Sequence, residues 1–150
     1  MRGEYSPLAL RHRTALVAAA CLLAGLLLVG CGRRSLPPEA VVRAWSDAVN
    51  TAENERAAKL FAGGAITVVG ATERSLHTRE EAIAWTAALP CAGLVRKLAT
   101  HQDIVTVLFL LGDRERGSCA ARNGTATIEF EVRHNKIVFY RQLASTPASG

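Results

Sequence analysis

Hydrophobic residues fall into three patterns along the chain. An unbroken apolar run covers residues 15–29 and follows a basic segment, as in an export signal. Apolar residues then recur at helical spacing over 38–49, and a second helix is expected to reach about Phe61 before two glycines end it. Residues 78–81, Thr-Arg-Glu-Glu, form a capping box that opens a third helix, which Pro90 ends.

The second half of the chain is strand-like. Its segments are rich in β-branched and aromatic residues, which favour a pleated, half-buried surface. The expected strands cover 94–100, 103–111, 125–133 and 136–143, after a short strand over 65–69. Polar residues connect them, with a loop over 70–77, tight turns at 101–102 and 134–135, and a long connection over 113–124.

The turns set the expected alignment of the strands, whose side chains alternate between two faces. The expected opposite pairs are Phe130–Phe139, Ile128–Arg141, Leu94–Phe109 and Arg96–Val107. Across the long connection, Val107 is expected beside Phe130 and Phe109 beside Ile128. One face then collects the apolar side chains of Leu94, Leu98, Val105, Val107, Phe109, Ala126, Ile128, Phe130, Val132, Ile137, Phe139 and Leu143. Arg96 and Arg141 interrupt this face, where an unpaired guanidinium is costly. Each therefore extends to an edge of the sheet or lies in a cavity able to hold an anionic or carbonyl-bearing ligand.

The opposite face is polar, and Glu129 and Glu131 fall on it, but it also carries an apolar group. The members of this group are Val95, Ile104, Leu108, Leu110, Val138 and Tyr140. A solvated face does not need so much apolar surface. We therefore expect a protein partner or a second copy of the chain, forming a homodimer, to dock there.

Charge and motifs exclude several classes of function. The chain has 18 basic and 13 acidic residues, of which residues 1–30 hold three and one, so the remainder carries a net charge of +3. No stretch combines clustered Lys and Arg with aromatic residues, and nucleic-acid binding is not indicated. The sequence contains no glycine-rich phosphate loop, nucleophile elbow or metal-ligand spacing, so we expect no cofactor and no metal.

The end of the apolar run, Leu28-Val29-Gly30-Cys31, resembles a bacterial lipobox. The resemblance implies that residues 1–30 are a signal peptide and that Cys31 carries a diacylglyceryl group, which anchors the chain on the extracytoplasmic side of a bacterial membrane. An uncleaved membrane helix or plain secretion are the alternatives, although the run is short of the roughly 20 residues of a spanning helix. The remaining organisation is a tether over 31–37, a domain over 38–143 and a flexible tail over 144–150.

Cysteine usage follows from this export signal. Cys21 leaves with the leader and Cys31 is acylated, so Cys91 and Cys119 remain as a pair in an oxidising compartment. We expect them to form a disulfide. Two free thiols or a metal pair are the alternatives, but no other Cys or His lies at ligand spacing beside either residue.

The order of elements, with helices and a short strand followed by a long antiparallel meander, resembles the nuclear transport factor 2-like fold. SnoaL-like and ketosteroid-isomerase-like proteins share this fold. The resemblance covers residues 38–143 and rests on the helix of Trp45, the helix start at 78–81 and the closing strand at 136–140. It implies an α+β cone in which three N-terminal helices pack on a curved antiparallel sheet around an apolar pocket, often with a dimer formed through the sheet.

The expected site is a ligand pocket rather than a catalytic centre. Its expected lining is Trp45, Trp85, Arg96, Phe109, Ile128, Phe130 and Arg141. No position matches the catalytic acid and tyrosine of the isomerases, because Glu129, Glu131 and Tyr140 fall on the outward face. The first hypothesis is a non-catalytic, lipid-anchored envelope domain that binds a small apolar or anionic ligand or a protein partner. The alternatives are an accessory subunit docked through the outer sheet face, and an isomerase, cyclase or dehydratase acting on a carbonyl-bearing substrate, with His77 as base and Arg141 as electrophile.

Overall fold

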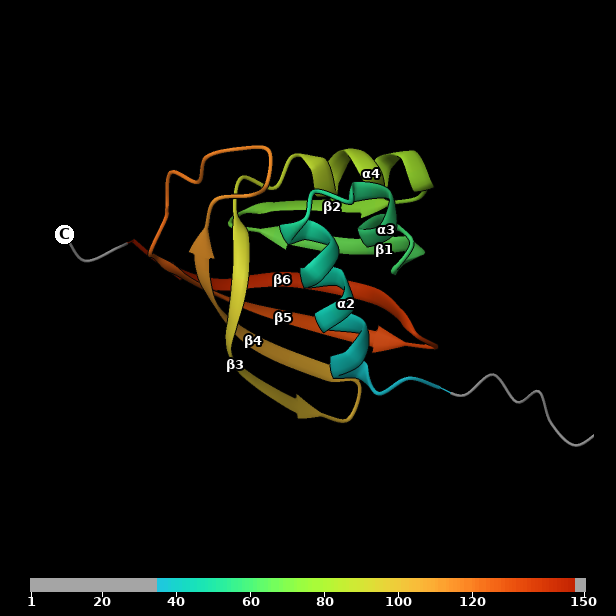
Figure 1. Cartoon of the computed structure of the whole chain (residues 1–150). Helices are drawn as coiled ribbons and strands as arrows, with labels where there is room; N and C mark the ends of the chain where they lie inside the picture. Colours follow the sequence, from blue (N-terminus) through green and yellow to red (C-terminus); the bar gives the residue numbers. More distant parts are fainter. Residues whose placement is uncertain (1–34, 148–150) are drawn as a thin grey trace, which may run out of the picture. The chain divides into compact units, whose positions relative to one another are not determined.

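The computed structural model describes residues 35–147 (Figure 1). The expected signal peptide and Cys31 lie outside these residues. Among the helices of the described range, none has the length and apolar character needed to cross a membrane.

The described residues contain three helices and six strands. The helices are α2 (Pro38–Asn50), α3 (Asn54–Ala58) and α4 (Arg79–Ala87). The strands are β1 (Phe61–Val69), β2 (Thr72–Leu76), β3 (Ala92–His101), β4 (Ile104–Gly112), β5 (Thr125–Arg133) and β6 (Lys136–Thr146). They form one sheet in the order β2-β1-β6-β5-β4-β3, in which only the β1–β6 pair is parallel. The α+β class is confirmed, and the sheet is mixed rather than wholly antiparallel.

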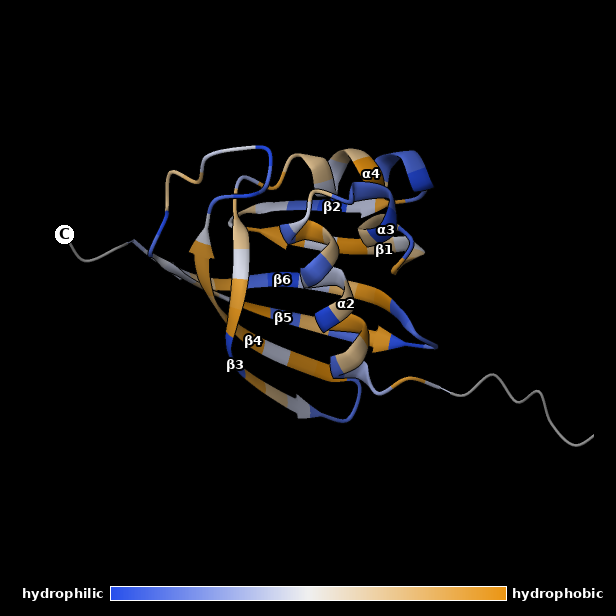
Figure 2. Cartoon of the chain, in the orientation of Figure 1, coloured by the Kyte–Doolittle hydropathy of each residue, from blue (hydrophilic) through white to orange (hydrophobic). Residues whose placement is uncertain are grey.

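Helix α2 lies across one face of the curved sheet and contacts β3, β4, β5 and β6 (Figure 1). Its buried residues follow helical spacing and are Val41, Val42, Trp45, Ser46, Ala48 and Val49. In β5, buried and half-buried residues alternate, so one face packs on the helix. Figure 2 shows hydrophobic residues along α2 and the strands behind it.

Five aromatic rings meet in this core. They belong to Trp45, Phe61, Trp85, Phe130 and Tyr140, with ring centroids between 4.9 and 6.5 Å apart. Most pairs meet edge to face, the arrangement that aromatic quadrupoles favour. The cluster ties α2, β1, α4, β5 and β6 together.

The capping box of α4 is confirmed. The Thr78 hydroxyl accepts a hydrogen bond from the Glu81 backbone N–H at 3.1 Å. The Glu81 carboxylate accepts from the backbone N–H groups of Thr78 at 3.1 Å and His77 at 2.6 Å. These two donors hold the pKa of Glu81 below its ordinary value of 4.5.

The segment after α3 differs from the expectation. The second helix ends before Phe61, which begins β1. Gly63 and Gly64, expected to end the helix, lie inside β1, where Gly64 has a φ of +79° that suits glycine. The pairing of β1 with β6 shifts register between Phe61 and Ile66. The expected loop over 70–77 contains β2.

A bulge at Val138 reverses the expected faces of β6. Relative to β5, β6 gains one residue between Ile137 and Phe139. Phe130 therefore pairs with Tyr140 rather than with Phe139. As a result Tyr140, expected on the outer face, is buried among the aromatic rings.

A second bulge, at Leu143, follows in the same strand. It lies between the pairs Ile128–Gln142 and Thr127–Ala144. Arg141 pairs with Glu129 rather than with Ile128 because of the first bulge, at Val138. Leu143 is 49% exposed rather than inside. The strand then continues to Thr146, so its last three residues extend into the segment expected to be a flexible tail.

The β3–β4 hairpin also carries a bulge. Val95 pairs with Phe109 and Lys97 with Leu108, which leaves Arg96 as the extra residue. Val95 therefore faces the core, whereas Leu94, expected there, is 59% exposed. Between β4 and β5 the register differs from the expectation by two residues, which leaves the faces unchanged.

Candidate ligand-binding site

A cavity of about 210 Å³ lies between α2 and the sheet. Helix α2 contributes Trp45 and Asn50, and the sheet contributes Phe109, Ile128 and Tyr140. None of the described residues that line it carries a charged side chain. Because an unpaired buried charge is costly, this lining favours a neutral, largely apolar occupant.

Tyr140 contributes a phenol to the lining of this cavity. The bulge at Val138 turns this side chain to the inner face of the sheet. The residue is 3% exposed, and burial raises the pKa of its phenol above the ordinary value. The phenol is neutral near pH 7 and is able to donate a hydrogen bond to a ligand. The amide of Gln142 lines the same cavity two residues further along β6 and adds a second neutral polar group.

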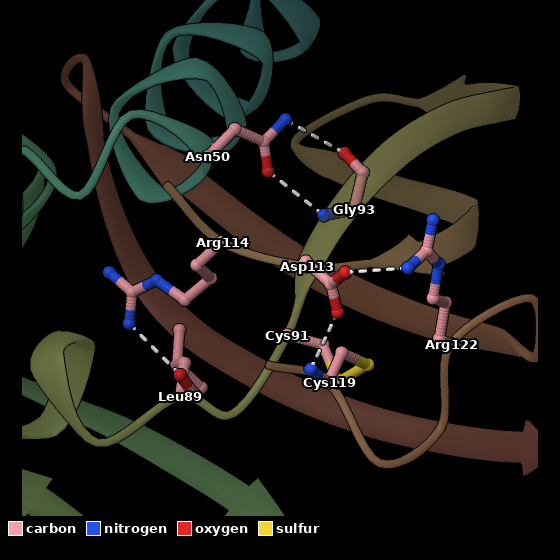
Figure 3. Close-up of a disulfide and its surroundings, with 8 residues drawn as sticks. All are labelled: Asn50, Leu89, Cys91, Gly93, Asp113, Arg114, Cys119 and Arg122. Atoms are coloured by element: carbon pink, nitrogen blue, oxygen red, sulfur yellow. Dashed lines mark hydrogen bonds and ion pairs between the residues drawn. A yellow bond between two sulfur atoms is a disulfide. The ribbon is translucent and has the colours of Figure 1, made fainter. Parts of the chain in front are cut away.

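On one side of the cavity, hydrogen bonds join α2 to the start of β3. The Asn50 side chain donates to the Gly93 carbonyl at 3.1 Å and accepts from the Gly93 N–H at 2.9 Å, as Figure 3 shows. The Ser46 hydroxyl donates to the same carbonyl at 3.1 Å. These polar groups of the lining are therefore already paired, and they fix the first residues of β3 against the helix.

The apolar part of the predicted pocket divides between the cavity and the core. Trp45, Phe109 and Ile128 line the cavity. Trp85 and Phe130 lie instead in the aromatic cluster. The indole N–H of Trp45 is enclosed and has no hydrogen-bond acceptor among the described residues, and it lies beside the rings of that cluster.

The predicted polar residues lie elsewhere. Arg96 and Arg141 are exposed, and the Arg141 guanidinium sits 4.9 Å from the centroid of the Phe139 ring. His77 is exposed at the start of α4, beside a separate hollow that Lys59 and Arg79 also line. The structure therefore does not bring His77 and Arg141 together, and neither reaches the cavity.

Cys91 and Cys119 form a disulfide with a Cα–Cα distance of 4.8 Å (Figure 3), as the cysteine count predicts. Cys91 lies in the short connection between α4 and β3 and lines the cavity. Cys119 belongs to the long connection between β4 and β5, whose Ala121 also lines the cavity. The bond thus joins two walls of the site.

Arg114, which sequence reasoning missed, is buried beside this wall. Its guanidinium donates to the carbonyl oxygens of Val49, Thr86 and Leu89 at 3.2, 3.0 and 2.9 Å, and to the Asn54 side chain at 2.6 Å. Burial lowers the pKa of Arg114, but a guanidinium stays protonated. The cation therefore meets the carbonyl ends of α2 and α4, where helix dipoles favour positive charge.

The outer face of the sheet keeps only part of its expected apolar group. Val95 and Tyr140 turn inward. Leu94, Ile104 and Leu143 are exposed there, at 59%, 40% and 49%. Within residues 35–147, no group of three His, Cys, Asp or Glu side chains is arranged to hold a metal ion.

No family model matches the sequence, and no curated protein does either. Solved structures do match the fold. A nuclear transport factor 2-like protein of unknown function from Cytophaga hutchinsonii superposes with a TM-score of 0.60 at 12% identity, over 73% of this chain and 90% of that one.

Two further structures are similar. A protein with a ketosteroid isomerase-like fold from Catenulispora acidiphila, in complex with trimethylamine, has a TM-score of 0.56 at 18% identity, over 69% of this chain and 84% of its own. A putative polyketide cyclase from Sinorhizobium meliloti has a TM-score of 0.57 at 17% identity, over 71% of this chain and 94% of its own. The helix laid across a curved sheet, the strand order and these similarities show that the chain has the nuclear transport factor 2-like fold.

Proposed function

We propose that this chain is a non-catalytic binding domain of the bacterial cell envelope, anchored by lipid at Cys31, that holds a small neutral molecule in the cavity under α2. The observation that carries the proposal is the lining, which is apolar and uncharged and presents the Tyr140 phenol as a neutral donor. An anionic ligand is not favoured, because neither Arg96 nor Arg141 reaches the cavity.

The size of the cavity limits the ligand. About 210 Å³ is below the roughly 300–1,000 Å³ of sites for drug-sized molecules and above the roughly 150 Å³ that hold benzene. A fused two-ring compound is therefore a suitable size. The phenol of Tyr140 favours a ligand with one hydrogen-bond acceptor, such as a ketone.

The enzymatic alternative requires a group that can take a proton near neutral pH. No carboxylate or imidazole lines the cavity among the described residues. The raised pKa of Tyr140 makes its phenol a donor rather than a base. The arrangement thus supports holding a carbonyl compound more than transforming it.

Tyr140→Phe tests the proposal with two ligands of the same shape, 2-acetylnaphthalene and 2-isopropenylnaphthalene. We expect the native protein to bind the ketone about fivefold more tightly than the alkene, because one hydrogen bond contributes about 1 kcal/mol. The variant should bind both equally. Quenching of tryptophan fluorescence reports binding, since Trp45 lines the cavity.

The alkene is the internal control, because its affinity should be the same in both proteins. Equal affinity of the native protein for the two ligands would show that Tyr140 does not donate a hydrogen bond to the ketone oxygen. If neither ligand quenches the fluorescence, the binding function itself is wrong.

A further inference from the structure

The connection between β4 and β5 is fixed at its two ends. At its base, the Leu111 N–H donates to the Gly124 carbonyl at 2.8 Å, and the Asn123 N–H donates to the Leu111 carbonyl at 2.9 Å. Arg114 holds the first side through the carbonyls of the helices. These contacts involve backbone and a buried cation, so they do not depend on the disulfide.

Between these ends, few contacts besides the disulfide hold the connection. The Glu115 N–H donates to the Asn50 carbonyl at 3.4 Å, Arg114 and Gly117 form an isolated bridge, and the Arg122 N–H donates to the Cys119 carbonyl at 3.1 Å. Within residues 115–123, only Cys119 is buried and Ala121 half-buried, while the other side chains are exposed. The Asp113 carboxylate accepts from the Cys119 N–H at 2.8 Å and pairs with Arg122 at 2.9 Å. That ion pair is largely exposed, and such pairs contribute only about 0–1 kcal/mol. A segment with so few buried contacts opens locally once its tie is removed.

The other half of the disulfide belongs to the lining of the cavity. Cys91 lines the site two residues before Gly93, which Asn50 and Ser46 hold against α2. The disulfide therefore joins the weakly held connection between β4 and β5, which carries Ala121, to Cys91, directly before the start of β3, which is held against α2 (Figure 3).

We propose that the Cys91–Cys119 disulfide is a redox-sensitive clasp on the ligand cavity. The oxidised form keeps the wall closed on the ligand, and reduction frees residues 115–122 and weakens binding. This inference rests on the proposed binding function and adds its regulation.

The reaction is thiol–disulfide exchange with a dithiol reductant. One thiolate attacks a sulfur of the cystine and displaces the other cysteine as a thiolate. The second thiol of the reductant then resolves the mixed disulfide. Two electrons and two protons pass to the protein, which ends with two thiols, and the reductant ends as a disulfide.

The test measures affinity of the full chain for 2-acetylnaphthalene before and after treatment with dithiothreitol. We expect reduction to lower the affinity about tenfold and reoxidation to restore it. Cys91→Ala/Cys119→Ala should bind as weakly as the reduced protein and should not respond to dithiothreitol. Arg122→Gln, which removes the exposed ion pair and keeps the disulfide, should bind as the oxidised protein does.

Hydrogen exchange followed by mass spectrometry distinguishes local opening of the connection from a loss of stability of the whole domain. Reduction should speed exchange in residues 115–122 and leave β5 and β6 protected. Equal affinity in the two redox states, or loss of protection throughout the sheet, overturns the clasp. If the oxidised protein binds no probe at all, the proposed function fails instead, and local opening on reduction still shows whether the wall is released.

Discussion

A methyl group at position 93 would have no room. A Cβ built on Gly93 would lie 2.7 Å from Cδ1 and 3.0 Å from Cγ of Phe109, which is the floor of the ligand cavity. We expect Gly93→Ala to lower the free energy of unfolding by about 1–3 kcal/mol, because overpacking displaces the ring or the strand. Urea denaturation followed by circular dichroism measures the change.

Gly112→Ala is the matched control. Gly112 lies in the neighbouring strand, and a Cβ there would meet no atom within 4 Å. Its stability should stay within about 0.5 kcal/mol of the native value. An equal loss in both variants would mean that strand glycines as such, and not the contact with Phe109, set the cost.

Single residues also mark the limit of prediction from the sequence. The cysteine count, together with the expected export, predicts the disulfide partners. Arg114 could not be found in this way, because it lies in a polar loop with no periodic pattern. Its partners are carbonyl oxygens of two helices far away in the chain, and only the folded chain brings them together.

At the scale of single elements, the capping box gives α4 a dependence on pH. The lowered pKa of Glu81 means that its ionised form is favoured in the folded state. Its contribution to stability is therefore present above the ordinary value of 4.5 and disappears as the pH falls through the lowered pKa. Glu81→Gln should be less stable than the native protein near neutral pH, and the difference should vanish in acid.

Urea unfolding near neutral pH and again in acid, below the lowered pKa of Glu81, measures this difference in the free energy of unfolding. Glu80→Gln removes a carboxylate from the same turn that takes no part in the capping box, so it should keep the native dependence on pH. A difference between Glu81→Gln and the native protein that persists in acid would assign the loss to packing rather than to the charge.

The element scale shows why the faces of the sheet were only partly predictable. Strands β4 and β5 have the expected alternation, and their inward residues were identified correctly. In β3 and β6, single extra residues at Arg96, Val138 and Leu143 shift the pattern. A bulge adds no distinctive residue, so alternation alone could not reveal it. For this reason Tyr140 was placed on the wrong face and the one phenol of the cavity was missed.

At the scale of the whole molecule, the proposed location depends on Cys31, outside the described residues. We expect the native protein, extracted with detergent, to begin at Cys31 and to carry two or three acyl chains, because lipobox cleavage follows diacylglyceryl transfer. Intact mass spectrometry measures both. Cys31→Ser is the control and should remain uncleaved without acyl mass. A native polypeptide that begins at Met1 would contradict the anchor.

The position of β6 in the sheet has a consequence for how the chain is made. Of the described strands, β6 is synthesised after the other five, yet it lies between β1 and β5 and is the neighbour of β1 on the side away from β2. The β1–β2 hairpin therefore cannot join the rest of the sheet until β6 has emerged from the ribosome. Pairing between such distant segments slows folding. A late-closing sheet keeps the nascent polypeptide unfolded for longer, which is the state that the proposed export through a membrane channel would require.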